Sequence, residues 1–183
     1  MNKSHQSLSL GEVALRLDRS GIPWAVFAGA AASAYGATRP LTDIDILVPA
    51  AKGNRLLAIF PEGDVEFCQE GMLVLALPGL DLLAGMGFTN LDAEMAARLT
   101  RHEIAGVDVP VVPPEDNVLI KALMGRGLEE GKHDWEDIEA MMSHLPELDW
   151  EYLHWRAGTF PDQQRMSQLC ERLEELWHRL GRA

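Results

Sequence analysis

The segment Gly36–Pro49 places two acids in a run that otherwise suits a buried strand. Its apolar residues predict a β-strand, yet Asp43 and Asp45 stand one residue apart within it. Because side chains alternate across a strand, both carboxylates project from the same face with their Cα atoms roughly 6–7 Å apart, while Ile44 points into the core. Two like charges this close repel each other, and partial burial increases that cost. A compensating positive charge would remove this cost.

A divalent cation supplies that charge. Carboxylate oxygens at this spacing suit Mg²⁺ or Mn²⁺, and Mg²⁺ keeps several water ligands and takes others from a substrate phosphate. The alternative is a strand end at which both acids face solvent, since a bare D-x-D is a short motif. The upstream sequence favours the metal, because an apolar strand, Trp24–Gly29, runs directly into a helix of small residues. The first backbone N–H groups of a helix have no intrahelical partner and form an anion site.

The chain alternates helices and strands up to residue 112 and is helical afterwards. We expect one α/β (α+β) half over residues 1–112 and a C-terminal helical lobe over 113–183, packed as a single compact unit. A two-residue turn at Pro78-Gly79 predicts a hairpin, and two short strands flank Gly106. The last helix, Asp162–Leu180, carries an apolar stripe that we expect to close the helical lobe rather than form a dimer seam.

Composition excludes several classes of protein. The chain has 183 residues, 47% of them hydrophobic, and a net charge of −12, so bulk disorder and broad contact with a phosphate backbone are not expected. No apolar stretch is long enough to span a membrane and no signal peptide opens the chain, so we expect a cytoplasmic protein. Cys68 and Cys170 are interpreted as two buried thiols rather than a disulfide or metal pair.

Two parts of the sequence resemble a known family. The run from Gly29-Ala30 through Tyr35-Gly36-Ala37-Thr38-Arg39-Pro40-Leu41-Thr42-Asp43-Ile44-Asp45 is similar to the signature of small bacterial nucleotidyltransferases of the DNA polymerase beta superfamily, closest to the AbiEii-type abortive-infection branch. The segments PPEDNVLIKALMGRG and KHDWEDIEAM resemble two helices of the same branch. The resemblance covers most of Trp24–Met142 and implies a nucleotidyltransferase-like mixed sheet flanked by helices.

The resemblance also implies the site residues. Asp43 and Asp45 hold the metal, and the third carboxylate that the family requires is Asp81 in GLDLLAG. Without the resemblance, an acid that follows a Pro-Gly turn is more often solvated. Gly29 and Ala30, together with Arg39 and Lys121, are the expected nucleotide contacts.

Three features qualify these assignments. Ala30 stands where the family has Gly or Ser, and Pro40 restricts Arg39 to an extended conformation. Lys121 has three interpretations: a phosphate contact, a partner of Asp134 that fixes the helical lobe against the α/β lobe, or a surface lysine whose stem covers apolar residues.

The implied activity is metal-dependent transfer of an NMP from an NTP to an acceptor hydroxyl, with release of pyrophosphate. The acceptor is left open among a small molecule, a protein and tRNA. Two alternatives remain. One is a sugar-nucleotide transferase, which also uses D-x-D, although the strand-to-helix turn at Gly29 and the short chain disfavour it. The other is a catalytically silent binding module, for example in a toxin–antitoxin-like pair.

Overall fold

The computed structural model describes residues 8–69, 72–86, 89–130 and 132–182. The chain divides into two compact units. The α/β unit comprises the chain up to Ala30 together with Leu41–Val112, and the helical unit comprises Ala31–Pro40 together with the chain from Pro113 onward. The segment Ala31–Pro40 therefore belongs to the helical unit, although its position in the sequence predicted that it would be part of the α/β half.

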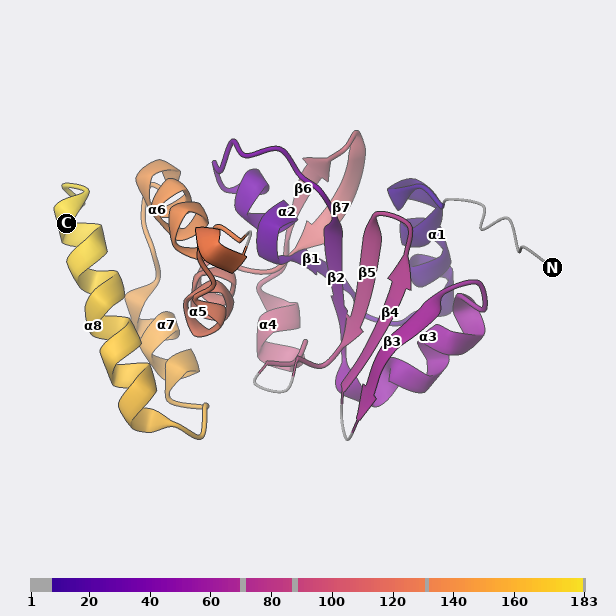
Figure 1. The fold of residues 1–183 in the computed structure, drawn as a ribbon. Coiled ribbons are helices and arrows are strands. Elements are labelled where there is room, and N and C mark those ends of the chain that lie inside the picture. The colour runs from indigo at the N-terminus through magenta and orange to yellow at the C-terminus, as the bar shows by residue number, and fades with distance from the viewer. Residues whose placement is uncertain (1–7, 70–71, 87–88, 131, 183) are drawn as a thin grey trace. The chain divides into compact units, whose positions relative to one another are not determined.

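The α/β unit is built on a mixed seven-stranded sheet with the order β3-β4-β5-β2-β1-β7-β6 (Figure 1). Two pairs, β2–β5 and β1–β7, are parallel, and the other pairs are antiparallel. The strands are β1 (Ala25–Phe27), β2 (Ile44–Val48), β3 (Asp64–Gln69), β4 (Met72–Leu77), β5 (Leu80–Ala84), β6 (Thr100–Ile104) and β7 (Val107–Val111). This confirms the predicted mixed α/β class.

Both predicted hairpins are present. The β4–β5 hairpin closes through Pro78 and Gly79, and Gly79 has the positive φ of 78° that glycine adopts without strain. The β6–β7 hairpin closes through Ala105 and Gly106, whose φ values of 50° and 77° match a type I′ turn. In both cases the local turn chemistry was sufficient to predict the connection.

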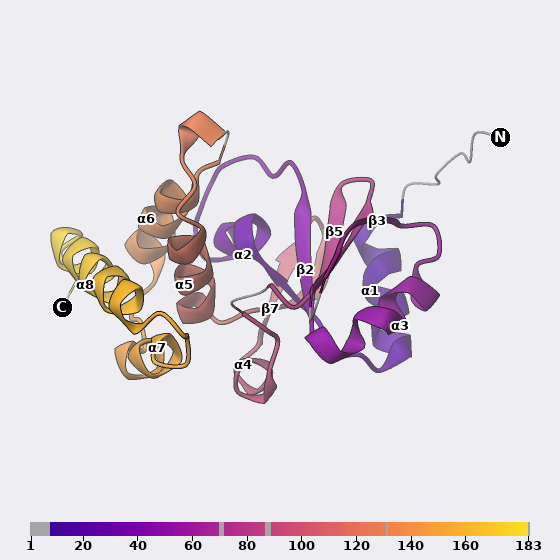
Figure 2. The ribbon, with the colours of Figure 1, turned by 60° about the horizontal axis from the view of Figure 1, so that its bottom comes forward.

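The described part of the α/β unit contains the helices α1 (Leu10–Ser20), α3 (Gly53–Ile59) and α4 (Ala93–Ala97), with a 3₁₀ turn at Ala50–Lys52. Helix α1 begins at a capping box formed by Ser9 and Glu12 and ends at Gly21, which is left-handed. Helices α1 and α3 pack against each other and against strands of the sheet, and the two views show them side by side (Figures 1 and 2).

The helical unit contains α5 (Pro114–Met124), α6 (Asp134–His144), α7 (Trp150–Ala157), α8 (Gln163–Arg179) and a 3₁₀ turn at Leu128–Glu130. Helix α5 contacts both α6 and α7, and α7 contacts α8. The apolar stripe of α8 is buried through Met166, Cys170, Leu173, Leu176 and Trp177. The stripe therefore completes the core of this unit, as expected. None of the helices in the described ranges is long and apolar enough to cross a membrane.

One prediction about the cysteines is wrong. Cys170 is buried on α8, but Cys68 is exposed. Its strand, β3, is at one edge of the sheet and leaves most of its side chains exposed. The apolar letters of VEFCQ therefore do not indicate a buried strand.

Candidate active site

Two neighbouring strands place two of the predicted acids side by side in the sheet. Asp45 on β2 is the register partner of Asp81 on the parallel strand β5. On the other side of β2, Asp45 is the register partner of Phe27, the last residue of β1. Adjacent strands lie about 4.8 Å apart and register partners share a face, so the two carboxylates are neighbours on one face.

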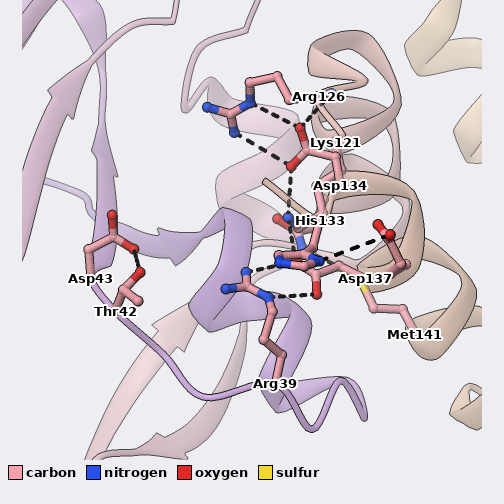
Figure 3. Close-up of polar contacts among 11 residues, drawn as sticks. Arg39, Thr42, Asp43, Lys121, Arg126, His133, Asp134, Asp137 and Met141 are labelled. Atoms are coloured by element: carbon pink, nitrogen blue, oxygen red, sulfur yellow. Dashed lines mark hydrogen bonds and ion pairs between the residues drawn. The ribbon is translucent and has the colours of Figure 1, made fainter. Parts of the chain in front are cut away.

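Asp43 lies immediately before β2, two residues from Asp45. Its side chain is half-buried, and Oδ1 accepts a hydrogen bond of 2.9 Å from the Thr42 hydroxyl (Figure 3). Asp45 and Asp81 are also half-buried. All three acids therefore lie at the end of β2 nearest to the turn that joins β4 to β5, where Ile44 donates a backbone hydrogen bond to the Gly79 carbonyl.

The pairing of β2 with β5 determines how well these acids suit a divalent cation. A hard cation such as Mg²⁺ takes oxygen ligands, and this register places two carboxylates beside each other. Within the described ranges, however, no three His, Cys, Asp or Glu side chains are already arranged to hold a metal ion. The strands thus bring Asp45 and Asp81 side by side with Asp43 two residues away, while the carboxylates are not arranged around a common centre.

The predicted phosphate element lies at the same end of the sheet. Helix α2 (Ala28–Ala34) follows β1 without a loop, directly after the residue that pairs with Asp45. Ala28 has a φ of 55°, a left-handed conformation that costs roughly 1–2 kcal/mol for a residue with a Cβ atom. Gly29 is half-buried and Ala30 is fully buried. The sequence offered no signal for this strained junction, because alanine does not mark left-handed positions.

The helical unit contains a network of five charged side chains, shown in Figure 3. Lys121 on α5 forms ion pairs with Asp134 and Asp137 of α6, at 3.1 and 2.8 Å. The side chains of all three residues are at most 4% exposed. Arg126 binds Asp134 from its backbone N–H and its Nε, both at 3.0 Å. Arg39 binds Asp137 with two guanidinium nitrogens, at 3.3 and 3.1 Å.

These contacts keep both aspartates ionised. Burial raises the pKa of the Asp134 carboxyl. The hydrogen bond from Arg126 and the charge of Lys121 together lower it by more than burial raises it, so the pKa lies below its ordinary value. Burial likewise raises the pKa of Asp137, and the hydrogen bonds from Arg39 and Lys121 bring it below the ordinary value. Three cations thus surround two carboxylates, which leaves one net positive charge.

The structure bears on two of the three interpretations of Lys121. Its side chain is 3% exposed, so it is not a surface lysine. The predicted pair with Asp134 is present at 3.1 Å, and both of its residues belong to the helical unit. A phosphate contact would require the ammonium group to leave two carboxylates, which is costly for a buried ion pair. Arg39, whose side chain is 33% exposed, is likewise held by Asp137.

Two features of the helical unit were not predicted. Gly36 has a φ of 111° and lies so close to α6 that a Cβ atom at this position would be 2.5 Å from the Cβ and Cγ atoms of His144. A second buried ion pair joins α5 to α7, because Asp116 accepts hydrogen bonds of 2.7 Å from Arg156 and from the Tyr152 hydroxyl. The glycine itself was visible in the sequence, but its partner 108 positions away was not.

The fold is similar to that of solved structures of other proteins. One similar structure is the solution structure of the antibiotic-resistance factor ANT(2'')-Ia, at a TM-score of 0.50 and 17% identity over 94% of this chain and 92% of that chain. Another is the lincosamide antibiotic adenylyltransferase LnuA with bound lincomycin, at a TM-score of 0.51 and 16% identity over 76% of this chain and 100% of that chain. No family model matches the sequence, and the comparison with curated proteins gives no match. The fold of this chain is nucleotidyltransferase-like.

Proposed function

We propose that the protein is a metal-dependent nucleotidyltransferase that moves an NMP from an NTP to an acceptor hydroxyl and releases pyrophosphate. The proposal rests mainly on the register of three strands. In this register Asp45 of β2 pairs with Asp81 of β5 on one side and with Phe27, the last residue of β1, on the other. A nucleotidyltransferase-like fold supports it, and so do the motifs that resemble the AbiEii-type branch.

Asp43, Asp45 and Asp81 would hold Mg²⁺ or Mn²⁺. When bound, the cation neutralises charge on the attacking and leaving oxygens of an in-line displacement. The Asp81 carboxylate would accept the proton of the acceptor hydroxyl as that oxygen bonds to the α-phosphorus. The bond from the α-phosphorus to the pyrophosphate oxygen breaks, and the pyrophosphate leaves with the electron pair of that bond.

The triphosphate would lie against the junction of β1 and α2. The small residues Gly29 and Ala30 let a phosphate approach the backbone there, and the lack of a hydroxyl at Ala30 leaves this contact to backbone N–H groups. Arg39 remains a proposed phosphate contact. We assign Lys121 to the buried ion-pair network rather than to the nucleotide, because both of its partners are buried carboxylates.

We favour a small hydroxyl-bearing acceptor over a nucleic acid. A chain with a net charge of −12 offers little attraction to an extended phosphate backbone. The structural similarity to an adenylyltransferase of lincosamide antibiotics is consistent with this choice. A tRNA acceptor and the silent binding module are then outcomes of the activity test.

An Asp81→Asn variant tests the assignment of the third carboxylate. We expect at least a 100-fold loss of pyrophosphate release, since a general base and metal ligand are removed together, and a Tm within about 2 °C of the wild type, as is usual for a half-buried polar site. The assay uses a panel of aminated and hydroxylated small molecules and a tRNA pool with each of the four NTPs. If the variant released pyrophosphate at the wild-type rate, Asp81 would be a solvated acid after a turn and not part of the site.

The wild-type panel separates the two proposed functions. Metal-dependent NTP binding without turnover on any acceptor would favour the silent binding module. Turnover on tRNA alone would move the acceptor to nucleic acid.

A further inference from the structure

The helical unit contains a cavity between α7 and α8, two helices that pack against each other (Figures 1 and 2). Its volume is about 370 Å³, which is within the range of small-molecule sites. The α8 residues that line it follow the period of the helix from Gln163 to Glu174 and so form one stripe. The other wall is the C-terminal half of α7 with Gly158. All of these residues belong to the helical unit, so the cavity is defined by that unit alone.

The cavity has an apolar floor and a polar rim. Its floor consists of Ala157, Met166 and Cys170, whose exposed fractions are at most 5%. The rim includes the carboxylates of Glu171, which is exposed, and Glu174, which is half-buried. A ligand that matches this lining has an apolar body and a polar head group.

Contacts within the protein hold the walls of the cavity in place. At one end of the lining stripe, Nε2 of His154 on α7 and Oε1 of Glu174 on α8 are joined by a hydrogen bond of 2.7 Å. At the other end, Nε2 of Gln163 donates to the carbonyl of Gly158 at 3.1 Å and to the carbonyl of Phe160. These bonds tie α7 to α8 and fix the turn between them, so the cavity is preorganised.

The rim is negatively charged. Among the side chains that line the cavity, Glu171 and Glu174 are acidic, and His154 is the one basic group. Glu171 has no ion pair within the described residues, and its printed contact is a hydrogen bond of 3.5 Å from the Ser167 hydroxyl. Helix α7 also ends here at Gly158, and the C-terminal end of a helix carries partial negative charge. The cavity therefore favours a cation.

Neighbouring arginines do not neutralise this charge, because they lie against other groups. Three arginines of the two helices have such partners: Arg156 binds Asp116, Arg165 donates to the Leu123 carbonyl, and Arg172 stacks on Trp135. The negative rim is thus left to a positive group from outside the chain.

The buried thiol of Cys170 reports the same charge at the floor of the cavity. Burial raises the pKa of this thiol, and the charges of Glu174 and Glu171 raise it further. The thiol therefore stays neutral. It has no hydrogen-bond partner within the described residues, so it offers a ligand a polarisable surface and a weak donor.

The lining suits an organic cation better than a metal ion. No three His, Cys, Asp or Glu side chains in the described ranges are arranged to hold a metal ion. A bare ion would also leave the apolar floor without a contact. An ammonium group on an apolar body uses the carboxylates and the floor together.

From this lining we propose that the helical unit binds a small organic cation in the cavity between α7 and α8. The ammonium group of the ligand donates hydrogen bonds to the carboxylates of Glu171 and Glu174. Its apolar body lies against Met166 and Cys170. The site uses none of the three proposed metal ligands, so it holds whether or not the protein transfers a nucleotide.

The experiment titrates the full chain with 2-phenylethylamine at about pH 7, where alkylamines are protonated. The matched neutral probe is 2-phenylethanol, which has the same apolar body and a hydroxyl in place of the ammonium. Calorimetry gives the Kd, and the amide chemical shifts of the labelled protein locate the bound probe. Neither Mg²⁺ nor an NTP is added, so the result is independent of the proposed function.

We expect the amine to bind with a Kd between roughly 10 µM and 1 mM, as suits a ligand of about nine non-hydrogen atoms. The shifts should concentrate on residues 154–174. The alcohol should bind at least about tenfold more weakly, because it cannot form charge-assisted hydrogen bonds.

Two sets of variants test the carboxylates. Glu171→Gln with Glu174→Gln keeps the shape of the rim and should raise the Kd at least about tenfold, since charged hydrogen-bond acceptors are lost. Glu171→Gln alone leaves the His154–Glu174 bond intact and should raise it at least about threefold. The matched control is Glu151→Gln with Glu175→Gln, which removes two exposed acids of the same helices outside the lining and should change the Kd less than about twofold.

Three results would overturn the inference. One is the lack of any saturable shift at the cavity with up to about 10 mM amine, a concentration above the weakest expected Kd. The others are equal affinities for the amine and the alcohol, and an unchanged Kd in Glu171→Gln with Glu174→Gln. Amide spectra of the variants without ligand show that each is folded before its Kd is compared.

Discussion

A Lys121→Met variant is expected to lose about 3 kcal/mol of the free energy of unfolding, because it removes one partner from a buried ion pair. Two carboxylates, those of Asp134 and Asp137, would remain buried with less compensation. We place the loss at the lower end of the usual range since each aspartate keeps one arginine. For a chain of this size the loss corresponds to a Tm lower by roughly 6–12 °C, measured by thermal unfolding.

The pH dependence of the Tm difference between the wild type and Lys121→Met shows whether lost ion pairing causes the destabilisation. The folded-state pKa values of Asp134 and Asp137 are depressed, so their stabilising contribution is present above the unfolded pKa of about 3.9 and is lost as the pH falls through the lower folded values. The difference in Tm between the wild type and Lys121→Met should therefore shrink below about pH 4. Lys132→Met, which removes an exposed lysine from the same unit, is the control and should change Tm little at either pH. A pH-independent difference would point to lost packing.

A Gly36→Ala variant should lose about 3 kcal/mol of unfolding free energy, from a positive φ that alanine rarely adopts and from steric overlap. The added Cβ atom would lie 2.5 Å from two atoms of His144, and the nearest of these are Cβ and Cγ, so rotation of the imidazole gives no relief. Gly21→Ala is the matched control, because Gly21 also has a positive φ, 67°, but nothing within 4 Å of an added Cβ.

Denaturant unfolding of the two glycine variants separates the contributions. The Gly21 variant should lose about 1 kcal/mol, the ordinary cost of a left-handed residue. Equal losses in the two variants would show that the close contact of Gly36 with His144 of α6 contributes nothing to the loss of stability.

Local structure was predictable where the sequence contains the chemistry that determines it. Ser9 and Gly21 mark the ends of α1, and Pro78-Gly79 and Gly106 mark the two hairpins, because caps and turns depend on residues that are adjacent in the chain. The amphipathic period of α8 predicted its buried face for the same reason.

Contacts between distant parts of the chain were not predictable in this way. The parallel pairing of Asp45 with Asp81 joins positions 36 residues apart, and Asp81 entered the site only through the family resemblance. Periodicity places Lys121 on a helix but cannot show that the surrounding positions of α5 are buried on nearly every side. The pairing of Arg39 with Asp137 depends on how Ala31–Pro40 joins the helical unit. In each case the tertiary structure decided the role of the residue.

The central claim is that Asp43 and Asp45 hold a metal-bound NTP, and titration calorimetry with Mg²⁺ and each of the four NTPs tests it most directly. The control variant is Asp64→Asn with Glu66→Gln, which removes two exposed acids at the same spacing from β3 of the same unit. The account predicts Mg²⁺-dependent binding of at least one NTP to the wild type and to this control, and none to Asp43→Asn with Asp45→Asn. Undiminished binding to the Asp43–Asp45 double variant, or no Mg²⁺-dependent binding of any NTP to the wild type, would contradict it.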